Sequence, residues 1–199
     1  DIFNDNITKV GHNTDRHFTN ERFALLFHPG TYTNIDVEVG YYVQLAGLGR
    51  NASSTNFQNC KMGPYVEAVN KRDIVGGRLG LSLDTFWRSA ENFAVTKTAD
   101  SDVGGDMLWA VSQAAPLRRV HIQGDLKLHD NGAQASGGVL ANAIIDGNVE
   151  FGSQQQYICR SVQFNGKEKM EAHNEYTSAW NAVFVDCSGD ALADGNDGK

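Results

Sequence analysis

The sequence predicts an all-β chain that folds as a right-handed parallel β-helix, a solenoid of short strands, with an N-terminal cap. Short runs of β-type residues alternate with glycines, and no stretch is long enough for the apolar face of a helix. A five-residue unit, apolar-x-apolar-x-Gly, occurs five times, and its last four copies begin 23, 19 and 23 residues apart. Strand units repeated at that spacing are typical of stacked coils. The copies are Val43–Gly47, Val120–Gly124, Ala143–Gly147, Val162–Gly166 and Val185–Gly189.

Side chains alternate across a strand, so the first and third positions of each unit face one side and the second and fourth face the other. The first and third positions are all apolar and are expected inside: Val43/Leu45, Val120/Ile122, Ala143/Ile145, Val162/Phe164 and Val185/Cys187. The second and fourth are mostly polar and are expected outside: Gln44/Ala46, His121/Gln123, Ile144/Asp146, Gln163/Asn165 and Asp186/Ser188. The closing glycine predicts a corner that needs a positive φ, or a bulge.

The remaining elements follow in chain order. Residues 1–22 are polar and aperiodic and are expected to form a cap or arm over the open end of the coil. The β-helix is expected over residues 23–190, and its first strands are Phe23–Phe27, Ile35–Val39 and Tyr41–Leu45. Lys167–Ser178 is long and charged, which predicts an excursion from the coil, and residues 191–199 are expected to be a disordered tail.

Composition limits the classes of function. With 199 residues, 41% of them apolar, the chain can bury one sizeable core and most simply forms one domain. The formal net charge of −7 disfavours nucleic acid as a partner, because phosphate binding relies on clustered Lys and Arg. No run approaches the roughly 18–20 apolar residues that cross a bilayer, so no membrane span is expected. A chain that starts at Asp1 without Met is expected to be processed or a fragment.

The three cysteines, Cys60, Cys159 and Cys187, leave at least one thiol unpaired. Cys187 falls on the predicted inner face, which favours a buried thiol, and a Cys159–Cys187 bridge between neighbouring coils stays open. The sequence contains no Cys/His cluster with zinc-ligand spacing and no glycine-rich phosphate loop between a strand and a helix. We therefore expect no metal and no cofactor.

Several segments resemble a known family. They are Arg22–Tyr32, Gly40–Gly49, Phe86–Val95 (FWRSAENFAV), Trp109–His121 (WAVSQAAPLRRVH), Ala135–Asp146 (ASGGVLANAIID) and Gly152–Tyr157 (GSQQQY). They are similar to secreted, mainly bacterial and fungal proteins, the discoidin-type (coagulation factor 5/8 type) domain proteins of the pectate-lyase-like parallel β-helix superfamily. The resemblance implies an extracellular protein with a β-helix of the kind that glycoside hydrolases and polysaccharide lyases use on long glycans. It implies no particular reaction.

Equivalent outward positions of successive coils stack about 4.8 Å apart, so an outward column presents polar groups at a repeat comparable to that of sugars. Hydrolysis of a glycosidic bond needs two carboxyl groups. The predicted catalytic residues are Asp125 and Asp146 as the carboxyl pair and His121 as an additional acid or base. The predicted binding residues are Gln123, Asn165, Gln163 and Asp186, with Tyr157 and Trp180 as stacking surfaces. The alternative is a solvated polar ladder with turn-capping aspartates. For Trp87 and Trp109, packing is favoured over an exposed role.

Two functions from different classes remain. The first is a secreted carbohydrate-binding or carbohydrate-cleaving module whose partner is a polysaccharide or glycan. The second is a non-catalytic structural or adapter subunit of a larger protein assembly, which would present a contiguous apolar or aromatic face.

Overall fold

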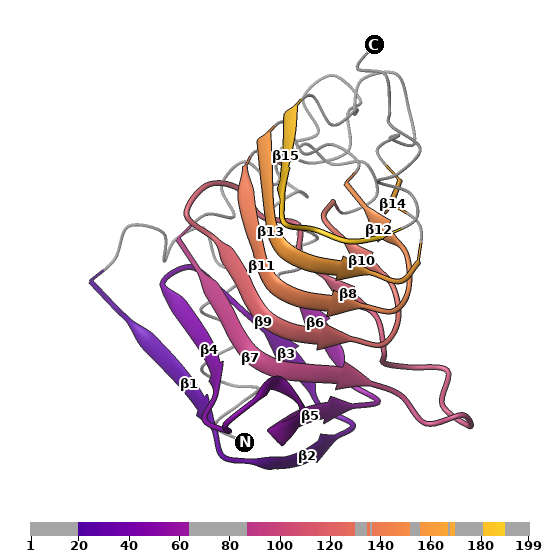
Figure 1. Ribbon diagram of the computed structural model, residues 1–199. Helices are drawn as coiled ribbons and strands as arrows, with labels where there is room; N and C mark the ends of the chain where they lie inside the picture. The colour runs from indigo at the N-terminus through magenta and orange to yellow at the C-terminus, as the bar shows by residue number, and fades with distance from the viewer. Residues whose placement is uncertain are drawn as a thin grey trace, which may run out of the picture.

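The chain forms a stack of parallel β-coils in the computed structural model, which describes residues 20–63, 87–129, 135, 137–151, 156–166, 168–169 and 181–189. The coils follow one another from the N-terminal to the C-terminal end of the stack (Figure 1). All pairings between the described strands are parallel. The expected all-β parallel β-helix is therefore confirmed.

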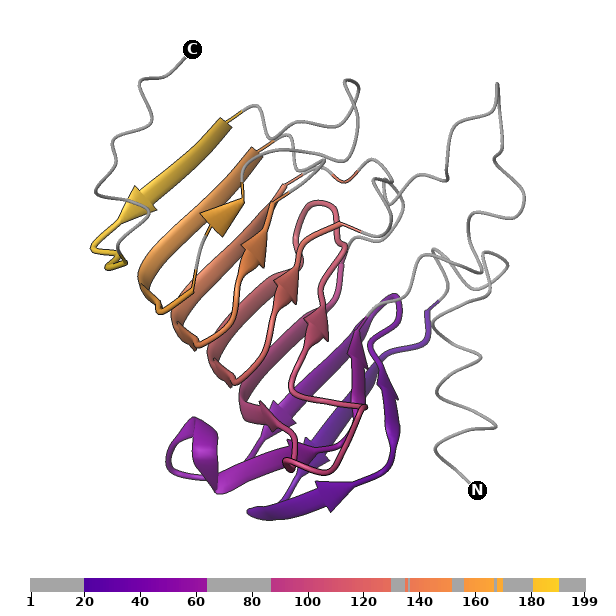
Figure 2. The same ribbon diagram turned by 90° about the vertical axis from the view of Figure 1, so that its right-hand side faces the viewer.

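Two sheets make up the described coils (Figure 2). The nine-stranded sheet contains β1 (Phe23–Phe27), β2 (Gly30–Thr33), β4 (Val43–Gly47), β5 (Thr55–Gln58), β7 (Ser89–Thr96), β9 (Pro116–Ile122), β11 (Gly138–Ile145), β13 (Gln156–Phe164) and β15 (Asn181–Val185). The six-stranded sheet contains β3 (Asp36–Glu38), β6 (Lys61–Gly63), β8 (Met107–Leu108), β10 (Leu126–Lys127), β12 (Val149–Glu150) and β14 (Glu168–Lys169). One 3-10 turn, η3 (Ala52–Ser54), lies between β4 and β5.

The long strands of the nine-stranded sheet bend at one residue each. The bend residues share a left-handed φ of 52–62° and stand opposite one another in successive coils: Asn92, Arg119, Asn142, Ser161 and Asp186. A single residue with positive φ turns the chain while the ladder continues on both sides of it. Each coil therefore has three straight segments, two from the bent strand and one from the six-stranded sheet.

Buried columns fill the inside of the stack. Residues at equivalent register positions on the three straight segments form one apolar cluster. Before the bend the column is Leu25, Leu45, Ala90, Leu117, Leu140 and Cys159; after it, Phe57, Val95, Ile122, Ile145 and Phe164; in the six-stranded sheet, Val37, Met62, Met107, Leu126 and Val149. Removing these side chains from water is the main force that holds the coils together.

Glycines pack where one coil passes over the next. A Cβ on Gly147 would lie 2.3 Å from the carbonyl carbon of Gly124, and one on Gly166 would lie 2.2 Å from the carbonyl oxygen of Gly147. None of these three has a positive φ. The expectation that these closing glycines serve a left-handed corner is therefore wrong, because close backbone approach between coils is what excludes a side chain here.

The first and last copies of the repeated unit have a different register from the middle three. Val43 lies opposite Phe23, before the bend. The last copy is shifted by two residues, because Val185 pairs with Arg160 and Ser188 bridges Gln163. Val185 is consequently 48% exposed, so its expected place inside is wrong.

The cysteines form no disulfide. The register places Phe184 beside Cys159, and it places Cys187 beside Val162. The bridge that the sequence left open between Cys159 and Cys187 is therefore absent.

Several sequence-based expectations lie outside the described residues. They are most of the cap over residues 1–22, most of the Lys167–Ser178 excursion and the tail over residues 191–199. Within the described part of the chain, no helix is long and apolar enough to span a bilayer.

Candidate functional site

The predicted polar column around Asp146 is assembled on the outer surface after the bend. The Asp146 carboxylate accepts a hydrogen bond from Asn165 Nδ2 (2.7 Å) and lies 2.8 Å from His121 Nε2. Gln163 Nε2 donates to Asn165 Oδ1 (2.9 Å), and Gln123 Oε1 accepts from a backbone N–H (2.7 Å). Five of the predicted residues therefore share one outer surface, since β9, β11 and β13 pair in the register that joins them.

The electrostatics of this cluster favour an ionised carboxylate. Partial burial alone would raise the pKa of Asp146, but the hydrogen bonds from His121 and Asn165 and the charge of His121 outweigh it, so its pKa lies below its ordinary value. Asp146 is then charged at neutral pH and holds no proton to donate to a leaving group. Its chemistry suits a general base, or an acceptor for sugar hydroxyls, and not a general acid.

Asp146→Asn tests this charge through stability. A lowered folded-state pKa means that the carboxylate stabilises the fold above its unfolded pKa and that this contribution is lost as pH falls through the folded pKa, below the ordinary 3.8. Because the Asp146 and His121 side chains are each 38% exposed, we expect the variant to lose only about 0.2–1 kcal/mol near neutral pH. Thermal melts of both proteins at decreasing pH should converge in acid; a difference that stays constant would contradict the assignment.

Asp125 belongs to a different network. Its Oδ1 accepts from the backbone N–H of Asn148 (2.7 Å) and from Asn148 Nδ2 (3.2 Å), and its own N–H donates to Asp106 Oδ1 (2.8 Å). These contacts tie the corner of one coil to the corner of the next. They favour the turn-capping alternative for Asp125, and no contact among the described residues joins Asp125 to Asp146. Its catalytic role stays a prediction.

The other predicted site residues lie elsewhere. Asp186 occupies the bend column, where its Oδ2 accepts from Ser161 Oγ (3.0 Å), so it does not stand in line with Gln163 as expected. Tyr157 is 2% exposed and packs edge-on against Phe151, so the expected stacking surface is wrong. Burial, with a contribution from neighbouring Cys159, raises the pKa of Tyr157 well above its ordinary value. Trp180 lies outside the described residues.

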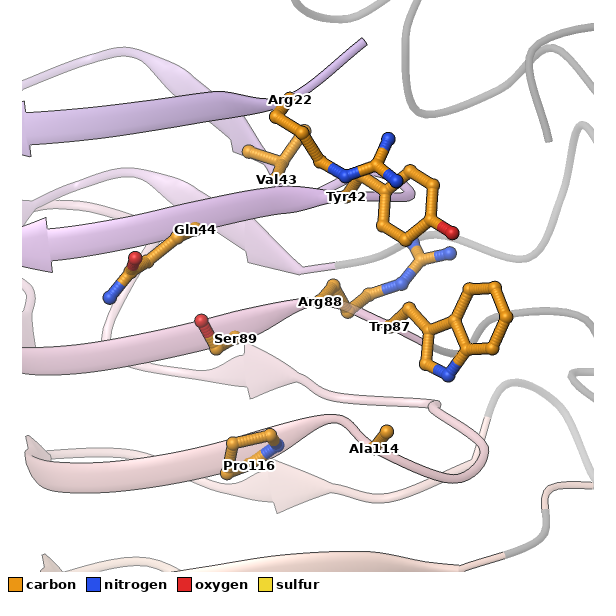
Figure 3. A pocket seen from close by; sticks show the side chains of 9 residues that line it. All are labelled: Arg22, Tyr42, Val43, Gln44, Trp87, Arg88, Ser89, Ala114 and Pro116. Carbon is orange, nitrogen blue, oxygen red and sulfur yellow. The ribbon is translucent and has the colours of Figure 1, made fainter. Parts of the chain in front are cut away.

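The structure also reveals a groove that the sequence analysis missed. It lies on the outer surface, at the N-terminal ends of the strands of the nine-stranded sheet. It consists of two adjoining cavities of ≈ 240 and ≈ 470 Å³, which share Ala114 and Pro116. Trp87 and Tyr42 line the first cavity (Figure 3). The expected packing role holds for Trp109, which is fully buried, but is wrong for Trp87, which is 42% exposed. Tyr42 lies directly before β4 and Trp87 lies two residues before β7, and no sequence pattern marked either position.

The floor of the second cavity is apolar and its edges carry amides. Val139, Ile158 and Val183 stand in one outward column on neighbouring rungs and are 37–53% exposed. Gln113 and Gln156 lie at the edge of the same cavity. Apolar surface combined with a few polar groups is typical of sites for small organic ligands. The described residues contain no group of His, Cys, Asp and Glu side chains that could hold a metal ion.

Comparisons with known proteins point to a carbohydrate-active relative. The chain is 42% identical over 150 residues to an exo-β-1,3-glucanase of Streptomyces sp. (strain SirexAA-E / ActE), a match that covers 75% of this chain and 22% of that protein. The solved structure of sacteLam55A from Streptomyces sp. SirexAA-E matches 86% of this chain and 28% of its own, with 36% identity and a TM-score of 0.67. A variant of sacteLam55A in complex with glucose matches 92% of this chain and 32% of its own, with 34% identity and a TM-score of 0.63.

The matched region thus spans less than a third of the length of each of these relatives. No family model matches it. The similarity covers most of the chain. Its sequence identity of 34–42% indicates common ancestry as well as a shared fold.

Proposed function

We propose that this chain is a carbohydrate-binding β-helix module of a secreted protein that acts on β-1,3-glucan. The observation that carries the proposal is the 42% identity over 150 residues to an exo-β-1,3-glucanase. The groove beside Trp87 supports it, because an exposed aromatic ring with amides nearby suits the apolar faces and hydroxyl edges of glucose rings. The expected secreted location is part of the same proposal.

Within this function, Asp146 is the candidate general base and His121 and Asn165 orient it. Hydrolysis needs a second carboxyl group that donates a proton to the leaving oxygen. Asp125 remains the candidate for that second group, and the Asp146→Asn and Asp125→Asn variants test the pair.

Binding and cleavage of β-1,3-glucan by the full chain test the proposal. We expect retarded migration of the chain in gels that contain β-1,3-glucan, and none in gels that contain an acidic pectin, because the net charge of −7 opposes a polyanion. Released glucose measures cleavage in the same samples. A chain that neither binds nor cleaves β-1,3-glucan would contradict the proposed function.

Where cleavage is observed, Asp146→Asn should lower turnover by about 100-fold or more while the protein stays folded, because the amide cannot accept a proton. Asp186→Asn is the matched control, since it changes a carboxylate at the bend and should leave turnover unchanged. Wild-type turnover in both Asp146→Asn and Asp125→Asn would remove the proposed catalytic site.

The adapter alternative has one observation in its favour, the exposed apolar column of Val139, Ile158 and Val183. The same column forms the floor of the groove, so glycan binding and protein docking would use the same surface. Sedimentation of the chain in its native extract separates the two, because an adapter would move with a partner and bind no glucan.

A further inference from the structure

One side-chain column runs along the corner where each bent strand begins. Extending the register by one to three residues places Arg22, Tyr42, Trp87, Ala114 and Gly137 on successive coils of this column. The next member, Gln156, stands opposite Gly137 by the same register. The side chains therefore change along the column from large and flat to very small, and then to an amide.

The large members of the column form a stack. The Arg22 guanidinium lies 3.1 Å from the centre of the Tyr42 ring. The Tyr42 and Trp87 rings are nearly parallel, with an interplanar angle of 7° and centroids 5.4 Å apart. Figure 3 shows these residues on neighbouring rungs, and beyond Trp87 the next rung offers only the methyl group of Ala114. Trp87 is 42% exposed.

The residues that carry the exposed rings have a strained backbone conformation. Tyr42, Trp87 and Ala114 all have a left-handed φ of 55–58°. Bulky residues adopt that region at a cost of roughly 1 kcal/mol or more, and such strain is concentrated at functional sites. A glycine would form the same corner more easily, as Gly137 does at φ 86°.

Beyond Trp87, the small side chains leave a shelf. It passes over Ala114 and Gly137 to Gln156, three rungs away, or about 14 Å at the ~4.8 Å spacing of strands. The two cavities of ≈ 240 and ≈ 470 Å³ lie along it. A flat group that stacks on Trp87 would occupy the next position of the column, over Ala114.

The cations near the shelf do not point to an anionic ligand. Arg22 lies on the Tyr42 ring, and Arg88, which is 5% exposed, donates to the Val39 carbonyl at 2.7 Å. Both guanidinium groups thus already contact groups of the protein. A neutral ring with an apolar face and polar edges fits the surface better than a phosphate or an acidic sugar.

We propose that Trp87 is a stacking platform for a glucose ring, and that a β-1,3-linked glucan lies along the shelf over Ala114 and Gly137 toward Gln156. The inference rests on the proposed function and specifies where its ligand binds. The stack would then consist of Arg22, Tyr42, Trp87 and the glucose ring, with one flat group on each rung. This position lies before the bend, and the Asp146 cluster lies after it.

Two variants of the full chain test the platform in opposite ways. Trp87→Ala removes the platform, and Ala114→Tyr places a ring in the position proposed for the sugar. Ala114→Tyr is expected to fold because Tyr42 and Trp87 already occupy the same backbone conformation. Titration with a soluble β-1,3-linked glucose oligosaccharide should show binding at least about tenfold weaker in both, equivalent to about 1.4 kcal/mol.

The controls separate binding from folding. Trp87→Phe keeps a flat ring and should retain most of the affinity, and Leu48→Ala removes an exposed apolar side chain (49% exposed) elsewhere and should retain all of it. Thermal melts report on the fold of each variant. Wild-type affinity in both Trp87→Ala and Ala114→Tyr would overturn the platform and leave the proposed function intact. No binding by the wild-type chain would defeat the proposed function, and the platform with it.

Discussion

Replacing Gly147 with alanine is expected to destabilise the fold by about 3 kcal/mol or more, because the new methyl group overlaps backbone atoms of the previous coil. Its Cβ would lie 2.3 and 2.4 Å from the carbonyl carbon and oxygen of Gly124, and 2.6 Å from Asp125 Oδ1. Backbone atoms cannot swing aside as a flexible side chain can, so the coils must separate locally. Urea unfolding followed by circular dichroism measures the loss.

Asn148→Ala is the control for this substitution. It changes the next residue and removes the side-chain hydrogen bond to Asp125 Oδ1 (3.2 Å) without adding a group to the corner, so it should cost about 1 kcal/mol. Equal stability of the wild-type protein and Gly147→Ala would show that the coils have room at this corner, against the close approach described above.

Trp109→Ala is expected to cost about 3–5 kcal/mol, the range for deleting a large aromatic side chain from a core. Trp109 is fully buried, and its indole N–H donates to the Ala115 carbonyl at 3.1 Å. The substitution leaves a cavity between the sheets and removes the hydrogen bond to the Ala115 carbonyl. The free energy of unfolding in urea is the measurement.

Two further variants separate the contributions at the tryptophans. Trp109→Phe keeps most of the volume and loses the hydrogen bond, so it should cost clearly less than Trp109→Ala. Trp87→Ala should cost about 1 kcal/mol or less, because exposed side chains away from the core contribute little. Equal losses in Trp87→Ala and Trp109→Ala would contradict the difference in burial between the two residues.

The alternation of side chains predicted the middle of the β-helix correctly, and with it the Asp146 cluster. Ala143 and Val162 stand opposite each other, and Phe93 stands opposite Val120, so inward and outward positions follow the simple pattern there. In the first copy Val43 and Leu45 are buried as expected, but the copy lies before the bend; in the last copy Val185 is exposed, and both differences have a physical reason. The pattern apolar-x-apolar fits a strand on either side of the bend, and the bend residue itself has no single identity that a sequence pattern would show.

The groove could not be predicted from sequence patterns alone. Trp87 and Trp109 both lie in largely apolar runs, yet the first is exposed and the second is buried. What separates them is the left-handed φ of 55° at Trp87, which depends on the corner where its coil begins. Tyr157 misled in the opposite direction, because its ring fills the space left by Gly138, where a Cβ would lie 2.5 Å from Tyr157 Cε2.

The column of bend residues gives every coil an equivalent position at which the chain can be joined to another coil. Because Asn92, Asn142 and Ser161 all play the same backbone part, a cut at one can be joined to a cut at another without moving any side chain to the wrong face. The segment from Asn142 to just before Ser161 is one whole turn of the solenoid, and we expect that it can be deleted or duplicated in register. The length of the solenoid could then be changed by one coil at a time.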